Sequence, residues 1–167
     1  VNRVFRSNRR IGLGIMGFGD LLYRLKIPYN SEQGVQTAEK VMKFINDTAH
    51  KTSQELAEEK GESPNWKLSI FYPNTKMRNV ALTCIAPTGS ISMICDVSSG
   101  VEPYFALVYV KSQVMGGQTL YYVNKHLEKE LKDRGLYSED IMNKIAQTGS
   151  VQNIKEIPED IKRIFVT

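Results

Sequence analysis

The sequence predicts an α/β fold that is rich in helix and forms one domain or part of one. Short apolar runs at 80–86 and 105–110, each bounded by Pro, Gly or Ser, predict buried strands. Apolar residues recurring every three or four positions predict helices on either side of them. With 167 residues, 41% of them hydrophobic and 24% charged, the chain is long enough to bury a core. It contains no internal repeat, low-complexity tract or convincing linker.

The composition excludes several classes of protein. No apolar run approaches the roughly 20 residues that a membrane-spanning helix needs. Residues 1–6 lack the apolar block of a signal peptide, so we expect a cytoplasmic protein without a membrane partner. Cys84 and Cys95 are too few for a disulfide framework or a cysteine-based zinc site. We expect His50 and His126 to be structural or surface residues rather than metal ligands.

The net charge of +4 suits anionic ligands without requiring nucleic acid. One dense basic cluster stands out, formed by Arg3, Arg6, Arg9 and Arg10. The main interpretation is a solvated stretch or a neighbour of phosphate groups, and contact with nucleic acid is the lesser alternative.

Residues 10–26 read as a helix despite the glycines at 12, 14, 17 and 19, with Pro28 as a stop signal. Glycine inside a helix costs about 1 kcal/mol relative to alanine. Four of them therefore indicate a close approach of the backbone to another helix or to a ligand.

A long helix is predicted next, beginning at a Ser31 cap and ending at Gly61. Its apolar positions form one stripe, expected to be buried: Val35, Ala38, Met42, Ile45, Ala49, Thr52 and Leu56. We expect this helix to lie against a sheet, and a coiled-coil partner is the alternative.

Beyond it, residues 62–79 are expected to form a long ordered loop. The strand 80–86 should lead through a short helix to the strand 105–110. In the C-terminal part, a helix carrying Leu120, Val123, Leu127 and Leu131 on one face should stop at Gly135. Ser138 should cap a further helix to Gly149, and Pro158 should open a last turn over 158–165.

Two segments are candidates for ligand chemistry. Gly12–Gly17 has the G-x-G-x-x-G spacing of a dinucleotide loop, but residues 6–10 are too polar to be the buried strand that such a loop follows. The second candidate is Ala86–Ser92, where the hydroxyls of Thr88, Ser90 and Ser92 surround Gly89 at a predicted helix start. A plain capping motif and an anion site both fit this second segment.

Residues 85–94, Ile-Ala-Pro-Thr-Gly-Ser-Ile-Ser-Met-Ile, and residues 98–109, Ser-Ser-Gly-Val-Glu-Pro-Tyr-Phe-Ala-Leu-Val-Tyr, closely resemble the substrate-phosphate region of ribonucleotide reductases. The adenosylcobalamin (vitamin B12)-dependent class is the most similar. The likeness covers nearly the whole chain and includes residues 10–18, 77–79, 130–137 and 157–159. We therefore expect the C-terminal part of the family's catalytic barrel.

The resemblance implies a segment of a ten-stranded α/β barrel that binds a ribonucleotide and reduces it by cysteine radical chemistry, with adenosylcobalamin as cofactor of the intact enzyme. It implies that the substrate phosphates bind at Ala86, Pro87, Thr88, Gly89, Ser90, Ile91 and Ser92. It also implies a partner, the remaining barrel polypeptide. A truncated barrel leaves sheet edges and an apolar face uncovered, so self-association is expected.

The chain departs from the family in its cysteines. The family's radical cysteine lies in an Asn-x-Cys-x-Glu motif, which is absent from these residues. Neither Cys84 nor Cys95 matches that context, so both are expected to be small buried side chains. Glu102 is expected to anchor a loop. We therefore expect a fragment that is inactive alone. A non-catalytic nucleotide-binding or assembly module from the same barrel is the alternative, and a nicotinamide-dependent dehydrogenase is a distant third.

Overall fold

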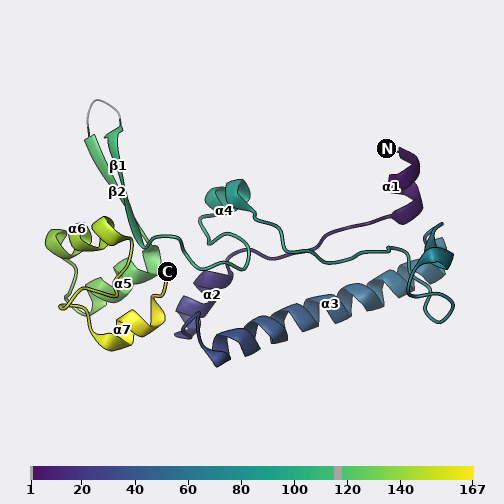
Figure 1. The fold of residues 1–167 in the computed structure, drawn as a ribbon, viewed down its shortest axis with the longest axis horizontal. Helices are drawn as coiled ribbons and strands as arrows, with labels where there is room; N and C mark the ends of the chain where they lie inside the picture. The colour runs from purple at the N-terminus through teal and green to yellow at the C-terminus, as the bar shows by residue number, and fades with distance from the viewer. Residues whose placement is uncertain (1, 115–117) are drawn as a thin grey trace. The chain divides into compact units, whose positions relative to one another are not determined.

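The computed structural model describes the backbone of residues 2–114 and 118–167, and the side chains of these residues outside 110–121 (Figure 1). Contacts within the chain divide it into two compact units. Unit 1 comprises Val1–Ile15 and Thr37–Pro87, and unit 2 comprises Met16–Gln36 and Thr88–Thr167. No helix in the described residues is both long enough and apolar enough to span a bilayer.

Unit 1 contains helix α1 (Asn2–Asn8), most of helix α3 (Glu32–Lys60) and a short 3-10 turn at Trp66–Leu68. A small core forms where Trp66, Met77 and Leu82 pack together. The indole Nε1 of Trp66 donates a 2.7 Å hydrogen bond to the carbonyl of Thr75. This bond joins two parts of the segment 62–79, so the prediction of an ordered loop there is confirmed.

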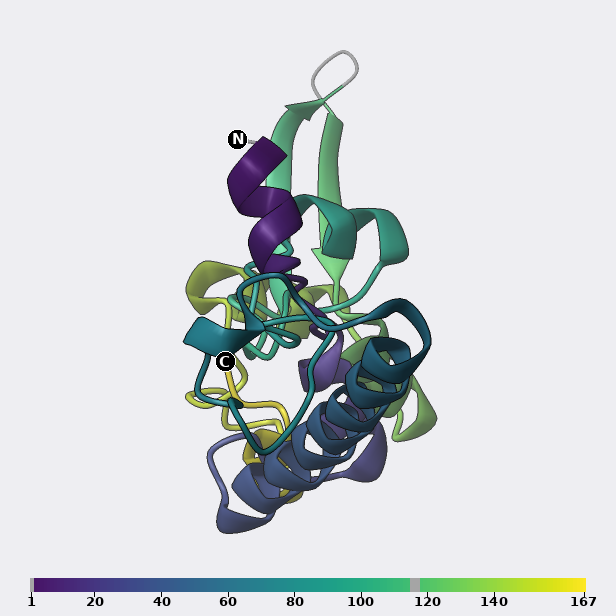
Figure 2. The same cartoon turned by 90° about the vertical axis from the view of Figure 1, so that its right-hand side faces the viewer.

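Helix α3 has the predicted boundaries and is uninterrupted in both views (Figures 1 and 2). The Ser31 hydroxyl accepts a 3.1 Å hydrogen bond from the amide of Gly34, which is the expected cap. Gly61 follows the helix with φ +80°, a conformation that favours glycine.

The predicted burial of the α3 stripe is wrong. Val35 is 61% exposed and Thr52 is also exposed, while Ala38, Met42, Ile45, Ala49 and Leu56 are only half-buried. The described residues of unit 1 form no sheet that could cover this stripe.

The predicted helix 10–26 is wrong in its first half, because helix α2 spans only Phe18–Leu25. Leu13 instead forms a parallel bridge with Thr83. A Cβ at position 12 would lie 2.7 Å from the Cys84 Sγ, and one at position 14 would lie 2.6 Å from the Cys84 carbonyl oxygen. The glycines therefore permit a close approach to an extended segment, rather than to a helix or a ligand.

The predicted strand 80–86 is likewise reduced to that bridge. The amide of Leu13 donates to the carbonyl of Leu82 at 2.8 Å, and the amide of Cys84 donates to the carbonyl of Leu13 at 3.0 Å. A segment paired on one side over so few residues does not make a regular strand.

Unit 2 contains α2, α4 (Gly89–Cys95), the antiparallel strands β1 (Val108–Val114) and β2 (Gln118–Val123), and helices α5 (Lys125–Asp133), α6 (Glu139–Thr148) and α7 (Glu159–Ile164) (Figure 1). Helix α6 packs against β1, and α2 contacts α5. The core consists of Tyr23, Leu107, Val108, Leu127, Leu131, Ile141, Met142, Ile145, Val151, Ile154, Ile157, Ile161, Ile164 and Phe165. Burying one such aliphatic side chain contributes about 1.5–3 kcal/mol.

The predicted strand 105–110 begins only at Val108, and the helix expected around Leu120 begins only at Lys125. Residues 118–123 pair with β1 instead, with Val123 opposite Val108. The Asn124 side chain then caps α5 by accepting from the amides of His126 and Leu127 at 3.0 and 3.1 Å.

The remaining C-terminal predictions are confirmed. Ser138 accepts a 3.2 Å hydrogen bond from the amide of Ile141 at the start of α6. Gly149 ends α6 with φ +73°, and Pro158 immediately precedes α7.

Candidate functional site

The predicted phosphate-binding stretch falls on both sides of the unit boundary. Ala86 and Pro87 are exposed residues of unit 1, whereas Thr88–Ser92 belong to unit 2. Thr88 precedes α4 in a left-handed conformation with φ 54°. No atom lies within 4 Å of a Cβ built on Gly89, and Gly89, Ser90 and Ile91 are all exposed. The first amides of a helix have no acceptor within it, and here they belong to three exposed residues.

The hydroxyls of this stretch do not all point outward. Ser92 is 2% exposed, and its Oγ lies 3.0 Å from the Ser99 Oγ. The Thr88 Oγ1 accepts a 2.7 Å hydrogen bond from the amide of Gly100, which leaves the hydroxyl hydrogen of Thr88 free to donate elsewhere. Ser92 therefore fixes the turn, while Thr88 and Ser90 retain donors for a ligand.

The loop 98–100 is held in turn by the start of α2. The Ser98 carbonyl accepts from the amide of Gly17 at 2.8 Å, and the Ser98 Oγ accepts from the amide of Gly19 at 3.0 Å. A Cβ on Gly19 would lie only 3.1 Å from that Oγ. Gly19 thus lets α2 approach the loop that binds Thr88 and Ser92.

A buried carboxylate anchors the same loop. Asp20 is 6% exposed, and its two oxygens accept from the Ser98 amide at 2.7 Å, the Tyr104 hydroxyl at 2.8 Å and the His126 Nε2 at 2.9 Å. A buried charge is tolerated only when it is hydrogen-bonded, and here each carboxylate oxygen has at least one partner. A chain of hydrogen bonds thus runs from α5 through Asp20 to the residues that shape the start of α4.

Two tyrosines close this network. Tyr23 stacks on Tyr104 with ring centroids 5.8 Å apart and donates to the Val166 carbonyl at 2.9 Å. Burial, followed by the hydrogen bond to Asp20, raises the pKa of Tyr104 well above its usual range. Burial, followed by the charge of Asp20, raises the pKa of Tyr23. Both hydroxyls therefore stay protonated, as donors, into the alkaline range.

Sequence reasoning missed this cluster. Asp20 and His126 are 106 positions apart, so no spacing rule connects them. The available signal was an acidic residue inside the apolar segment Phe18–Leu22, where a buried charge requires partners. His126 is structural, as expected, and His50 lies edge-on to Phe71 with centroids 5.7 Å apart.

The expectation that both cysteines are buried is wrong, since Cys84 and Cys95 are exposed. Their apolar neighbours are exposed as well, with Ile85 at 74%, Met93 at 78% and Ile94 at 83%. In each unit these side chains are apolar, but the described residues of that unit do not cover them. The Glu102 carboxylate is also exposed, and the loop is anchored by its backbone amide, which donates to the Ser99 carbonyl at 3.0 Å.

The dinucleotide interpretation of Gly12–Gly17 is not supported by its surroundings. Helix α1, and not a strand, precedes the glycines, and Gly12 and Gly14 lie against Cys84. Over the described residues there is no group of His, Cys, Asp and Glu arranged to hold a metal ion.

Known proteins match this chain over its whole length. The family model of the ribonucleotide reductase barrel domain matches residues 1–76 and 74–167. A vitamin B12-dependent ribonucleoside-diphosphate reductase of Thermoplasma acidophilum is 49% identical over 168 residues, covering 100% of this chain and 22% of that protein. One of the same description from Mycobacterium tuberculosis is 39% identical, covering 97% of this chain and 23% of that protein.

Among solved structures, the alpha subunit of the class Id ribonucleotide reductase of Actinobacillus ureae superposes with a TM-score of 0.81 at 34% identity. The superposition covers 100% of this chain and 29% of that subunit. The chain therefore spans between a fifth and a third of the length of these relatives. It belongs to the ribonucleotide reductase barrel-domain family and corresponds to the C-terminal part of that domain.

Proposed function

We propose that this chain supplies the substrate-phosphate loop of a ribonucleotide reductase, the enzyme class that converts ribonucleotides to deoxyribonucleotides. The loop comprises Ala86, Pro87, Thr88, Gly89, Ser90, Ile91 and Ser92. The observation that carries the proposal is the open space beside Gly89, at a helix start formed by the exposed residues Gly89, Ser90 and Ile91. Such amides, together with the partial positive charge of a helix start, attract phosphate.

Each residue has a distinct task in this proposal. The amides of Gly89, Ser90 and Ile91 donate to phosphate oxygens, and the hydroxyls of Thr88 and Ser90 add further donors. Ser92 acts indirectly through Ser99, since its side chain is buried. Asp20 positions the loop by binding the Ser98 amide.

The reduction itself is assigned to the rest of the enzyme. Cys84 and Cys95 lie outside the family's radical motif, so the chain alone should not reduce nucleotides. Relatives are named vitamin B12-dependent, and we assign adenosylcobalamin to the intact enzyme, where it supplies the radical chemistry.

The partner of this segment, in the same proposal, is the remainder of a ten-stranded barrel. The half-exposed stripe of α3 and the exposed residues Ile85, Ile91, Met93 and Ile94 are the surfaces it would cover. The isolated chain should therefore self-associate at high concentration.

Titration of the 15N-labelled chain with a nucleoside diphosphate tests the loop. The amide resonances of Gly89–Ile91 should shift. Gly89→Asp should abolish the shifts, because its carboxylate would compete for the same amides, whereas Gly89→Ala should preserve them, since the space is open. Shifts confined to residues other than 88–92 would contradict the proposal. Separately, ribonucleotide turnover by the purified chain with adenosylcobalamin and a dithiol would refute the inactivity of the fragment.

A further inference from the structure

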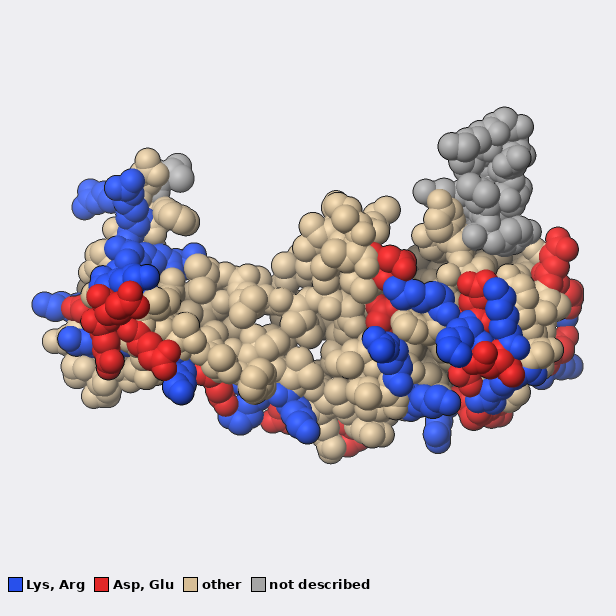
Figure 3. Space-filling view, turned by 180° about the vertical axis from the view of Figure 1, so that it is seen from behind, with Lys and Arg blue, Asp and Glu red and all other residues tan. Residues whose placement is uncertain are grey.

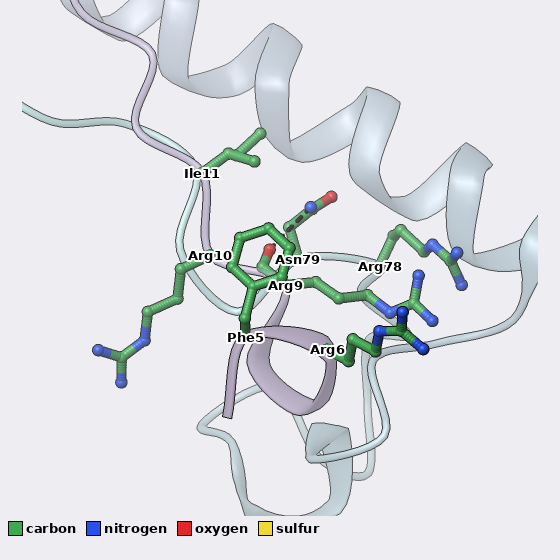
Figure 4. Close-up of a pocket in the computed structure, with 7 residues that line it drawn as sticks. All are labelled: Phe5, Arg6, Arg9, Arg10, Ile11, Arg78 and Asn79. Atoms are coloured by element: carbon green, nitrogen blue, oxygen red, sulfur yellow. Dashed lines mark hydrogen bonds between the residues drawn. The ribbon is translucent and has the colours of Figure 1, made fainter. Parts of the chain in front are cut away.

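Unit 1 contains a pocket of about 460 Å³ beside α1, shown in Figure 4. It is lined by Phe5, Arg6, Arg9, Arg10, Ile11, Arg78 and Asn79. These lining residues include four arginines and no acidic side chain. None of them belongs to the phosphate loop discussed above. Figure 3 shows Lys and Arg side chains gathered over α1, at the left of that view.

The arginines are not neutralised by the protein. In the part of the chain that the structure describes, no ion pair involves Arg6, Arg9, Arg10 or Arg78. The Nε of Arg9 is buried without a hydrogen-bond partner. In Figure 4 the guanidinium groups of Arg6, Arg9 and Arg78 lie on the same side of the pocket, while that of Arg10 points away. Like charges gathered in this way, with an unsatisfied buried N–H, favour binding of an anion.

Hydrogen bonds within unit 1 hold the backbone of Arg9 and the side chain of Arg78. Arg9 has a left-handed backbone with φ 49°, and its carbonyl accepts a 2.9 Å hydrogen bond from the Asn79 side chain. Asn79 is itself bonded to the buried Ser53 at 3.1 Å. Arg78 donates from Nη1 to the carbonyls of Lys60 and Gly61 at 2.7 and 2.9 Å. Neither arrangement uses a carboxylate, so the positive charges remain available.

We propose that this pocket binds the phosphate group of a small organic phosphate. A phosphate dianion offers more acceptor oxygens and more charge than a carboxylate, and so matches a pocket lined by several arginines better. Phe5 and Ile11, 68% and 53% exposed, give the pocket an apolar wall for the carbon part of the ligand. Binding of a nucleic acid would require basic side chains outside the pocket to contact further phosphates, and Arg3 on the same helix would then contribute to the affinity.

Calorimetric titration of the full 167-residue chain tests this proposal, using ADP and inorganic pyrophosphate as probes. The Gly89→Asp background removes any contribution from the phosphate loop, so the two proposals can fail independently. We expect saturable binding with one site for each chain. Arg9→Gln and Arg6→Gln should each weaken binding about tenfold or more, as expected for loss of a charge-assisted hydrogen bond.

Arg3→Gln is the matched control, because it removes the same charge from the same helix but does not line the pocket. The affinity of the Arg3→Gln variant for both probes should stay within about twofold of that of the Gly89→Asp background. Phe5→Ala should weaken binding of ADP but not of pyrophosphate. Circular dichroism of each variant checks folding, and Arg6 serves as the safer site because it is exposed.

Three results would overturn the proposal. One is the absence of saturable binding, and a second is equal weakening by Arg3→Gln and Arg6→Gln, which would indicate general charge attraction. The third is tighter binding of a single-stranded oligonucleotide that depends on Arg3, which would indicate a nucleic-acid surface.

Discussion

The carboxylate of Asp20 accepts a 2.9 Å hydrogen bond from the imidazole Nε2 of His126, although 106 positions separate the two residues. This contact joins α2 to α5, and the other Asp20 oxygen binds the Ser98 amide at 2.7 Å. One buried side chain therefore links the core of unit 2 to the loop beside α4.

Replacing Asp20 with asparagine tests the importance of this link. The asparagine side chain would keep the size but would place an NH2 group against one of the present donors, so we expect a loss of about 1–3 kcal/mol in the free energy of unfolding. Urea unfolding measures it. Asp133→Asn is the control, because Asp133 is 58% exposed and pairs with Lys129 at the surface, and it should change stability by less than about 0.5 kcal/mol. Equal effects of the two substitutions would contradict the anchoring role of Asp20.

Asp20→Asn should also increase the local opening of loop 98–100 while the rest of unit 2 remains folded. Hydrogen exchange at the Ser98 and Gly100 amides should accelerate in Asp20→Asn, because these amides bind Asp20 and Thr88. Exchange at Leu131, which is fully buried in the core, serves as the internal reference. Acceleration of all three amides by the same factor would indicate global destabilisation instead.

Tyr104 gives unit 2 a pH dependence in the alkaline range. Its pKa is raised from the ordinary value of 10.0 by burial and by the hydrogen bond to Asp20. Above about pH 10 the unfolded chain loses a proton that folded Tyr104 retains, so the free energy of unfolding falls as the pH rises. Tyr104→Phe should show a shallower fall in urea titrations between about pH 9.5 and 11. Parallel curves for both proteins would show that Tyr104 does not contribute.

Features controlled by local contacts could be predicted from the sequence. Ser31 and Ser138 cap their helices through amides three residues away, and Gly61 and Gly149 end them with positive φ. These signals depend only on nearby residues, so spacing was sufficient to find them.

Features controlled by contacts between residues far apart in the sequence could not be predicted from it. Leu120 and Val123 fit a helical face, yet pairing with Lys111 and Val108 places them in β2. The stripe of α3 and the two cysteines have apolar character that predicts burial, but burial requires covering surfaces that the described residues do not provide. The Asp20–His126 contact depends on the folded chain as a whole.

Gly12 and Gly14 allow a graded test of the close approach to Cys84. A methyl group at position 14 would meet the Cys84 carbonyl oxygen at 2.6 Å, and backbone cannot move aside easily. At position 12 it would meet the Sγ at 2.7 Å, which a rotation of the side chain can relieve. Gly14→Ala should therefore destabilise the chain by about 1–3 kcal/mol, and Gly12→Ala by less.

Two further variants separate the steric effect from the loss of glycine itself. Cys84→Ala should relieve the Gly12→Ala defect but not the Gly14→Ala defect, which a double-mutant cycle would measure. Gly89→Ala, where no atom lies within 4 Å, should leave stability nearly unchanged. Equal destabilisation at positions 12, 14 and 89 would show that chain entropy, and not contact with Cys84, sets the effect.

The exposed thiols give a direct test for the missing part of the barrel. Cys84 and Cys95 are both exposed, so both should react with a water-soluble disulfide reagent in the native chain as fast as in urea-unfolded chain, to within about tenfold. Adding a polypeptide that carries the remaining barrel should slow the reaction at each thiol, because it would cover the exposed apolar neighbours, Ile85 beside Cys84 and Ile94 beside Cys95. Cys84→Ser and Cys95→Ser assign the two rates separately. A rate that does not change on mixing would mean that the rest of the barrel does not bind beside that cysteine.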